Sequence, residues 1–88
     1  MKPELYILKM SNGQFYIGST PDLSRRFFEH CEGKVVSTKG KLPVEIVFHR
    51  EFKTLRDARQ AEYKLKSFKN KSIIERIVKD QLILFLGS

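Results

Sequence analysis

The stretch YILKMSNGQFYIG, residues 6–18, decides the fold of this chain. Two short apolar segments, Tyr6-Ile7-Leu8 and Tyr16-Ile17-Gly18, each open on a tyrosine, and Asn12-Gly13 lies between them. Asn-Gly between two strand-like segments is a strong signal for a tight turn. We therefore predict an antiparallel hairpin with strands over residues 5–10 and 14–18.

The length of the hairpin loop decides whether the two tyrosines can act together. A two-residue turn at Asn12-Gly13 would pair Lys9 with Tyr16 and place Tyr6 on the opposite face of the sheet. A three-residue loop over 11–13 would pair Leu8 with Tyr16 and bring both tyrosines to one face, with Gly13 supplying a left-handed residue. The sequence permits both registers.

A helix is expected to follow the hairpin. Asp22 is suited to cap its N-terminus, and Gly33 is suited to end it. Leu23, Phe27 and Cys31 recur at helical spacing and form its apolar stripe. We therefore expect Cys31 to be a small buried apolar group.

A basic loop over residues 34–43 precedes a third predicted strand over 44–52. In that strand Val44, Ile46 and Phe48 are expected to alternate with residues of the other face, although Val47 makes the alternation less clear.

Two more helices are expected in the second half of the chain. Thr54 is a suitable N-cap for one of them, and Ser72 with Glu75 forms a capping box for the other. The elements then run β-β-α-β-α-α. This order predicts an α+β fold, a small three-stranded antiparallel sheet flanked by three helices, in one domain over residues 1–88.

Composition narrows the class of partner. The 88 residues include 17 Lys and Arg against 10 Asp and Glu, a net charge of +7. Such an excess favours nucleic acid or an anionic membrane surface as the partner. A single cysteine excludes an intrachain disulfide and fits a reducing compartment. The longest apolar run, 82–86, is too short to span a bilayer. We expect a cytoplasmic protein that has no membrane partner.

The same apolar run is expected to be buried. In a helix, residues 82–86 would present apolar side chains on every side, and exposed clusters of this kind mark interfaces. The run is therefore expected to pack against the sheet or to form a homodimer through the C-terminal helix.

Polar residues on the predicted helices suggest a chemical site. Arg26 and His30 are four residues apart and share one helix face. Glu62 falls within an apolar arc, where a carboxylate is costly unless it is paired or bound to a cation. Lys66, one turn later, offers a purely structural salt bridge for Glu62. His49 has no second histidine or cysteine at metal spacing, so we expect a structural role for it and no zinc site.

Six segments occur in a specific order and spacing. They are YIL at 6–8, YIGST at 16–20, DLSRRFFEH at 22–30, GKVVSTK at 33–39, PVEIVF at 43–48 and ARQAEYKLKS at 58–67. Together they resemble the GIY-YIG nuclease family, and most closely its small standalone bacterial members, which are similar to the N-terminal domain of excision-repair nucleases. The chain departs from the family pattern in having no glycine directly before Tyr6. Repair-type members carry a lysine after the second motif, where this chain has Ser19. The later asparagine of some members has only Asn70 as a counterpart.

The resemblance implies a metal-dependent DNA endonuclease of DNA repair or recombination, with a partner protein as one source of specificity. It implies one Mg²⁺ ion, which Mn²⁺ can replace, held by the carboxylate of Glu62. The implied site consists of Tyr6 as base, Tyr16 as a substrate-positioning or supporting group, Arg26 as phosphate ligand, His30 as proton acceptor and Glu62 as metal ligand. The charge pattern adds Lys34, Lys39 and Lys41 as DNA-binding residues.

Two other classes of function fit the basic surface and the apolar tail. One is a non-catalytic nucleic-acid-binding module, and the other is a protein-interaction adaptor. Glu62 favours the nuclease, because a carboxylate facing a phosphate groove would only repel the ligand of a pure binder.

Overall fold

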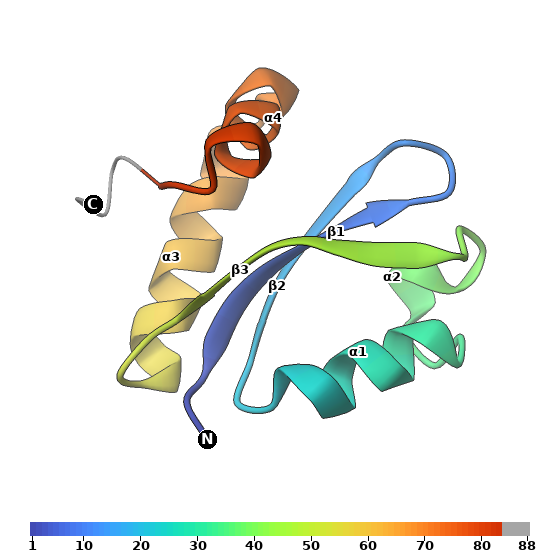
Figure 1. The fold of residues 1–88 in the computed structure, drawn as a ribbon, viewed down its shortest axis with the longest axis horizontal. Coiled ribbons are helices and arrows are strands. Elements are labelled where there is room, and N and C mark those ends of the chain that lie inside the picture. The colour runs from blue at the N-terminus through green and yellow to red at the C-terminus, as the bar shows by residue number, and fades with distance from the viewer. Residues whose placement is uncertain (84–88) are drawn as a thin grey trace.

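The computed structural model describes residues 1–83, and their elements follow the predicted order with one short addition. Figure 1 shows a twisted sheet between helices on its two faces. The elements are β1 (Glu4–Met10), β2 (Phe15–Thr20), α1 (Leu23–Cys31), α2 (Val36–Lys39), β3 (Val44–Glu51), α3 (Leu55–Ser67) and α4 (Lys71–Asp80). The four-residue helix α2 lies inside the segment predicted to be a basic loop.

The hairpin has the longer of the two possible loops. Leu8 pairs with Tyr16 and Tyr6 pairs with Gly18. The backbone N–H of Met10 donates to the carbonyl of Gln14 at 2.8 Å, and Gly13 has a φ of +85°. Glycine adopts this left-handed conformation without steric cost. Both tyrosines therefore lie on one face. The strand order β2-β1-β3 leaves β2 at an edge of the sheet.

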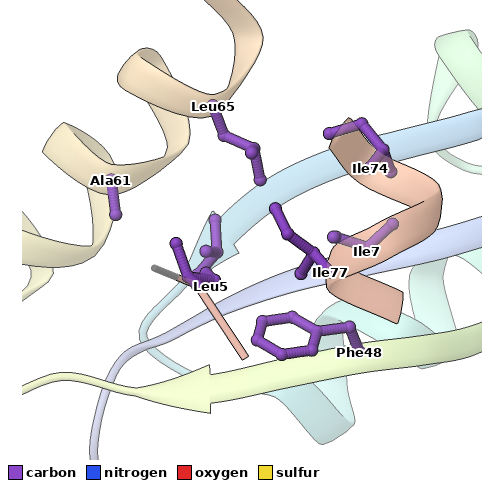
Figure 2. Close-up of a cluster of buried hydrophobic side chains, with 8 residues drawn as sticks. Leu5, Ile7, Phe48, Ala61, Leu65, Ile74 and Ile77 are labelled. Carbon is purple, nitrogen blue, oxygen red and sulfur yellow. The ribbon is translucent and has the colours of Figure 1, made fainter. Parts of the chain in front are cut away.

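The two faces of the sheet bury different clusters. Helices α3 and α4 cover the face of Leu5 and Ile7, which we call the α3 face (Figure 2). Helix α1 covers the opposite face, which we call the α1 face. Its cluster contains Tyr6, Leu8, Met10 and Val44, with Leu23 and Phe27 packed against them.

A bulge in β3 makes the predicted alternation of that strand wrong. Ile7 pairs with Phe48 but Leu8 pairs with Ile46, so Val47 is an extra residue. As a result Phe48 packs on the α3 face, whereas Ile46 packs on the α1 face. An extra residue of this kind reverses the side-chain alternation beyond it.

The structure confirms two of the three predicted helix caps. Asp22 and Thr54 accept hydrogen bonds from the backbone N–H groups of Arg25 and Asp57, each at 3.1 Å. The Ser72–Glu75 capping box is wrong. Helix α4 begins two residues earlier than this box implies, and the side chain of Asn70 caps it by accepting from the N–H of Ser72 at 2.9 Å. In this structure Asn70 is therefore a helix cap.

Two predictions about apolar residues were also wrong. Cys31 is exposed, because its neighbour His30 takes the buried position at the end of α1. Helix α4 ends at Asp80, with Gln81 in the left-handed conformation, so the helix does not continue into the apolar run. Ile83 is 1% exposed and packs in the α3-face core. Residues 84–86 lie outside the described part of the chain. Among residues 1–83, no helix combines the length and apolarity needed to cross a bilayer.

Candidate active site

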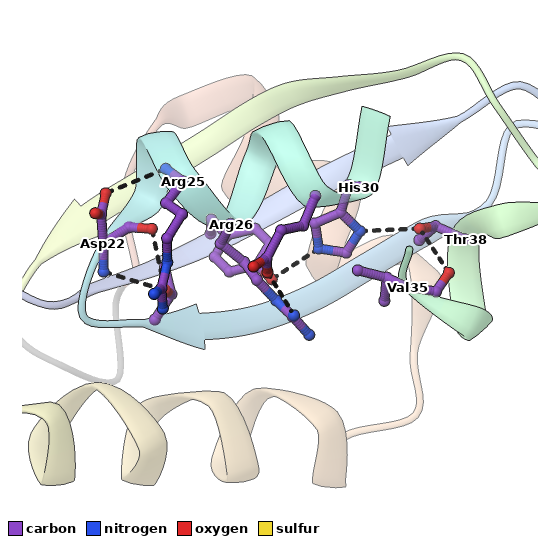
Figure 3. Close-up of polar contacts among 9 residues, drawn as sticks. Asp22, Arg25, Arg26, His30, Val35 and Thr38 are labelled. Atoms are coloured by element: carbon purple, nitrogen blue, oxygen red, sulfur yellow. Dashed lines mark hydrogen bonds and ion pairs between the residues drawn. The ribbon is translucent and has the colours of Figure 1, made fainter. Parts of the chain in front are cut away.

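A buried chain of three polar side chains links β1, α1 and α2. The hydroxyl of Tyr6 lies 2.9 Å from Nε2 of His30, and Nδ1 of the same ring lies 2.9 Å from the hydroxyl of Thr38. The residues are 1%, 0% and 0% exposed, respectively. Figure 3 shows His30 reaching from α1 towards Thr38. Because buried polar groups are costly without partners, these bonds explain why a histidine fits in the core.

The contacts of Thr38 favour one tautomer of His30. Its hydroxyl donates to the carbonyl of Val35 at 3.4 Å, as Figure 3 shows, which favours acceptance of a hydrogen bond from Nδ1–H of His30. Nε2 is then unprotonated and accepts the hydroxyl proton of Tyr6. Sequence reasoning missed Thr38, because it lies eight residues beyond His30 in a segment predicted to be a basic loop.

Burial keeps both rings of this pair neutral. Desolvation raises the pKa of Tyr6 from 10.0 to about 12, although the guanidinium of Arg26 acts in the opposite direction. Desolvation, followed by the charge of Arg26, lowers the pKa of His30 from 6.5 to about 4. At neutral pH a neutral tyrosine therefore donates to a neutral imidazole.

The depressed pKa of His30 predicts acid sensitivity of the fold. Between pH 6.5 and 4 the unfolded chain binds a proton on this ring that the folded chain does not bind. The stability that neutral His30 contributes is therefore present above pH 6.5 and is lost as the pH falls towards 4. The lowering of the His30 pKa from 6.5 to about 4 corresponds to a loss of up to about 3 kcal/mol in the free energy of unfolding.

Denaturant unfolding at several pH values measures this loss. A His30→Gln variant is the matched control, since both proteins share every other titrating group. The slope of stability against pH between 4 and 6.5 is expected to be steeper in the wild type. Parallel slopes would contradict the buried, neutral histidine.

Tyr16 and Arg26 lie where the buried chain approaches the surface. The Tyr16 ring is half-buried, 4.9 Å from the His30 ring and 6.2 Å from the Tyr6 ring. The guanidinium of Arg26 interacts with both tyrosines and forms an ion pair with Glu29 at 3.0 Å. That ion pair raises the pKa of Arg26, so its charge is permanent. Tyr6, Tyr16, Arg26 and His30 thus come together on the α1 face.

Gly18 makes room for the buried tyrosine. A Cβ atom at this position would lie 2.5 Å from the Tyr6 hydroxyl oxygen and 2.6 Å from Cζ. Only a residue without a side chain allows the ring to lie against the strand at this distance. The glycine of the second motif therefore fixes the position of Tyr6.

Glu62 approaches the same edge strand from the other face. It lies on α3, and its Oε1 accepts a hydrogen bond from the hydroxyl of Ser19 on β2. Its Oε2 forms an ion pair with Lys66 at 2.7 Å, so the predicted salt bridge exists. In Figure 3 β2 runs between α1 and α3. Adjacent residues of one strand, Gly18 and Ser19, thus contact Tyr6 on one side and Glu62 on the other.

Of the loop lysines, Lys41 lies beside the hairpin tip. The backbone N–H of Ser11 donates to the carbonyl of Lys41 at 3.0 Å, and Lys39 ends α2. Lys34 is exposed and is 3.7 Å from Glu32. His49, for which we expected a structural role, contacts Glu4 at 2.8 Å.

Comparison with known proteins identifies the family. The model of the GIY-YIG catalytic domain matches residues 2–76. The chain belongs to the GIY-YIG family. This catalytic domain is a nuclease domain, so the chain is assigned to a family of nucleases whose substrate is DNA.

The relatives of this GIY-YIG domain are small bacterial proteins. A UPF0213 protein of Bacillus pumilus is 40% identical over 67 residues, which cover 75% of this chain and 68% of the relative. A UPF0213 protein of Yersinia pseudotuberculosis is 36% identical over 96% of this chain and 93% of its own length. The solution NMR structure of a UPF0213 protein from Bacillus halodurans superposes with a TM-score of 0.59. It is 31% identical and covers 90% of this chain and 84% of its own. The α+β fold with a three-stranded antiparallel sheet is confirmed.

Proposed function

We propose that this protein is a metal-dependent DNA endonuclease with its active site on the exposed edge of β2. The observation that carries the proposal is the buried Tyr6–His30–Thr38 chain. This chain and Arg26 lie on one side of the edge of β2, and the Glu62 carboxylate lies on the other. Together these groups can bind and cut a phosphodiester.

In this proposal the two tyrosines share the handling of the proton. Tyr16 is half-buried and faces the attacking water, whereas Tyr6 is only 1% exposed. The burial of Tyr6 disfavours the simpler division in which Tyr6 alone meets the water. The Tyr16 hydroxyl takes a proton from the water as it gives its own proton to the hydroxyl of Tyr6, with which it interacts. The hydroxyl of Tyr6 in turn gives its proton to Nε2 of His30. Transfer of this kind contributes roughly a hundredfold to ten-thousandfold to a rate.

Arg26 couples phosphate binding to this transfer. Its guanidinium can hold a phosphate oxygen. Its charge is also one cause of the low pKa of His30, after desolvation. A phosphate bound to Arg26 offsets that charge and raises the proton affinity of His30 when substrate is present.

Glu62 is the residue that would hold the divalent metal. Residues 1–83 contain no cluster of three or more His, Cys, Asp or Glu that could bind a metal. A single carboxylate still fits Mg²⁺, which keeps several waters and binds through one or two carboxylates together with substrate phosphates. One oxygen of the carboxylate already forms an ion pair with the ammonium group of Lys66. When bound, Mg²⁺ or Mn²⁺ would stabilise negative charge on the phosphate and the leaving oxygen.

Ser19 orients the Glu62 carboxylate from β2. In this chain a neutral hydroxyl therefore occupies the place of a lysine after the second motif. We propose that any help from a cation at this edge comes instead from Arg26.

Lys34, Lys39 and Lys41 are proposed to bind the DNA backbone beside the site. A role in repair or recombination, a specificity partner and a homodimer through the C-terminal segment also remain proposals. The buried Ile83 leaves less apolar surface for such a dimer than the sequence suggested.

Separate variants of Arg26 and of the loop test this division of labour. Arg26→Ala is expected to lower turnover by about a hundredfold or more, because it removes a charge that stabilises the transition state. Neutralising the three loop lysines is expected to weaken DNA affinity and to reduce its salt dependence, by a slope of roughly 0.9 for each lost phosphate contact with duplex DNA.

Single-turnover rates and salt titrations of affinity measure the two effects. If both variants lose DNA affinity equally and neither loses turnover, the non-catalytic binding module would be favoured instead.

A further inference from the structure

A groove lies on the α3 face, apart from the tyrosines and the loop lysines. It has a volume of about 520 Å³ and lies between β2 and the junction of α3 with α4. Its lining includes three lysines and an apolar floor, and no acidic side chain. The residues that matter are Lys66, Lys69, Lys71, Phe15 and Ile17.

One lining residue of the groove contacts the proposed metal ligand. Lys66 is in the lining and forms an ion pair with Glu62 at 2.7 Å. Lys71 lies above the ring of Phe15, with its Nζ 5.9 Å from the ring centroid. Phe15 and Ile17 are half-buried on the side of β2 opposite Tyr16. An anion in this groove would thus lie beside the carboxylate edge of the site.

Two of the lysines occupy positions that are unfavourable for folding. Lys69 has a φ of +50°, a conformation that favours glycine or asparagine. Lys71 is the first residue of α4, whose first turn contains no acidic residue, and a positive charge there opposes the helix dipole. Residues that break local rules of stability are expected where they serve function. Their exposed charges around one cavity indicate a polyanion as the ligand.

We propose that this groove binds the sugar-phosphate backbone of the DNA strand next to the phosphate that is cut. Lys69 and Lys71 contact phosphates, and Phe15 and Ile17 support the sugar. This inference rests on the proposed function and adds a second basic contact, on the sheet face opposite the loop lysines. DNA would then be held on both sides of the edge of β2.

The test uses the full chain in chelator, so that binding is measured without cleavage. Lys69→Asn removes a charge while keeping a residue that tolerates positive φ, and Lys71→Gln removes a charge that opposes the dipole. Lys79→Gln is the matched control, because it removes the same charge from the exposed last turn of α4.

We expect the Lys69→Asn/Lys71→Gln double variant to bind labelled DNA about tenfold or more weakly. The slope of log affinity against log salt should become shallower by roughly 1.4 for single-stranded or 1.8 for duplex DNA. Its melting temperature should be unchanged or higher, whereas Lys79→Gln should bind nearly as the wild type does.

Two results would overturn the inference. The double variant could bind as tightly as the wild type while loop-lysine variants bind weakly, which would refute the groove and leave the nuclease proposal intact. Lys79→Gln could weaken binding as much as either groove variant, which would show that only net charge matters. Failure of the wild type to bind DNA would instead refute the proposed function together with this inference.

Discussion

Glu62→Gln is expected to abolish cleavage, lowering the single-turnover rate by about a thousandfold or more. The amide keeps the size of the side chain and can still accept from Ser19, but it loses the charge that would hold a divalent cation. The fold should persist, because a partly exposed ion pair with Lys66 contributes only about 0–1 kcal/mol. DNA affinity should be unchanged or slightly higher, since a negative charge near phosphates is removed.

Lys66→Ala is the matched control for this variant. It breaks the same ion pair but keeps the carboxylate, so it should cut at a near-normal rate when DNA is saturating. If Lys66→Ala loses as much activity as Glu62→Gln, the ion pair is what matters. Undiminished cleavage by Glu62→Gln would remove Glu62 from the site altogether.

Tyr6→Phe is expected to show the second largest effect, a fall in rate of about a hundredfold to ten-thousandfold. The change removes one oxygen and leaves Nε2 of His30 without its partner at 2.9 Å. That buried, unsatisfied nitrogen should also cost about 1–3 kcal/mol of stability. Cleavage rates and denaturant unfolding measure the two effects on the same samples.

Substitutions of Thr38 separate proton transfer from packing. Thr38→Val keeps the shape but loses the hydroxyl that accepts from Nδ1–H of His30, whereas Thr38→Ser keeps it. The valine variant should lose at least about tenfold in rate, as a part of the contribution from proton transfer. The serine variant should stay near the wild type. Equal rates for valine and serine would show that Thr38 only fills space.

Much of the fold could be predicted because local signals were strong. Asn12-Gly13 indicated the hairpin, and Asp22 and Thr54 indicated two helix starts. The register of the hairpin could not be chosen, because both loop lengths fit the same residues. The bulge at Val47 could not be predicted either. The run Ile46-Val47-Phe48 is apolar throughout, so it shows no alternation from which an extra residue could be recognised.

The candidate site was less visible, because its contacts join distant parts of the chain. The helical stripe pointed to Cys31 as the buried residue, but Tyr6 and Thr38 provide partners that bury His30 instead. Neither partner can be recognised from the sequence around His30. The preference for Asn70 over Ser72 as a cap was similarly hidden, since both are good capping residues.

The central claim is that this small domain cuts DNA with one divalent metal ion. The most direct measurement incubates the protein with labelled single-stranded, duplex, nicked and branched DNA, each with Mg²⁺, with Mn²⁺ and with chelator. Glu62→Gln, prepared in the same way, controls for contaminating nucleases. We expect internal cuts in at least one of these DNA structures with either metal, and none with chelator or with the variant. Binding without cleavage under every condition, or cleavage that Glu62→Gln retains, would contradict the account.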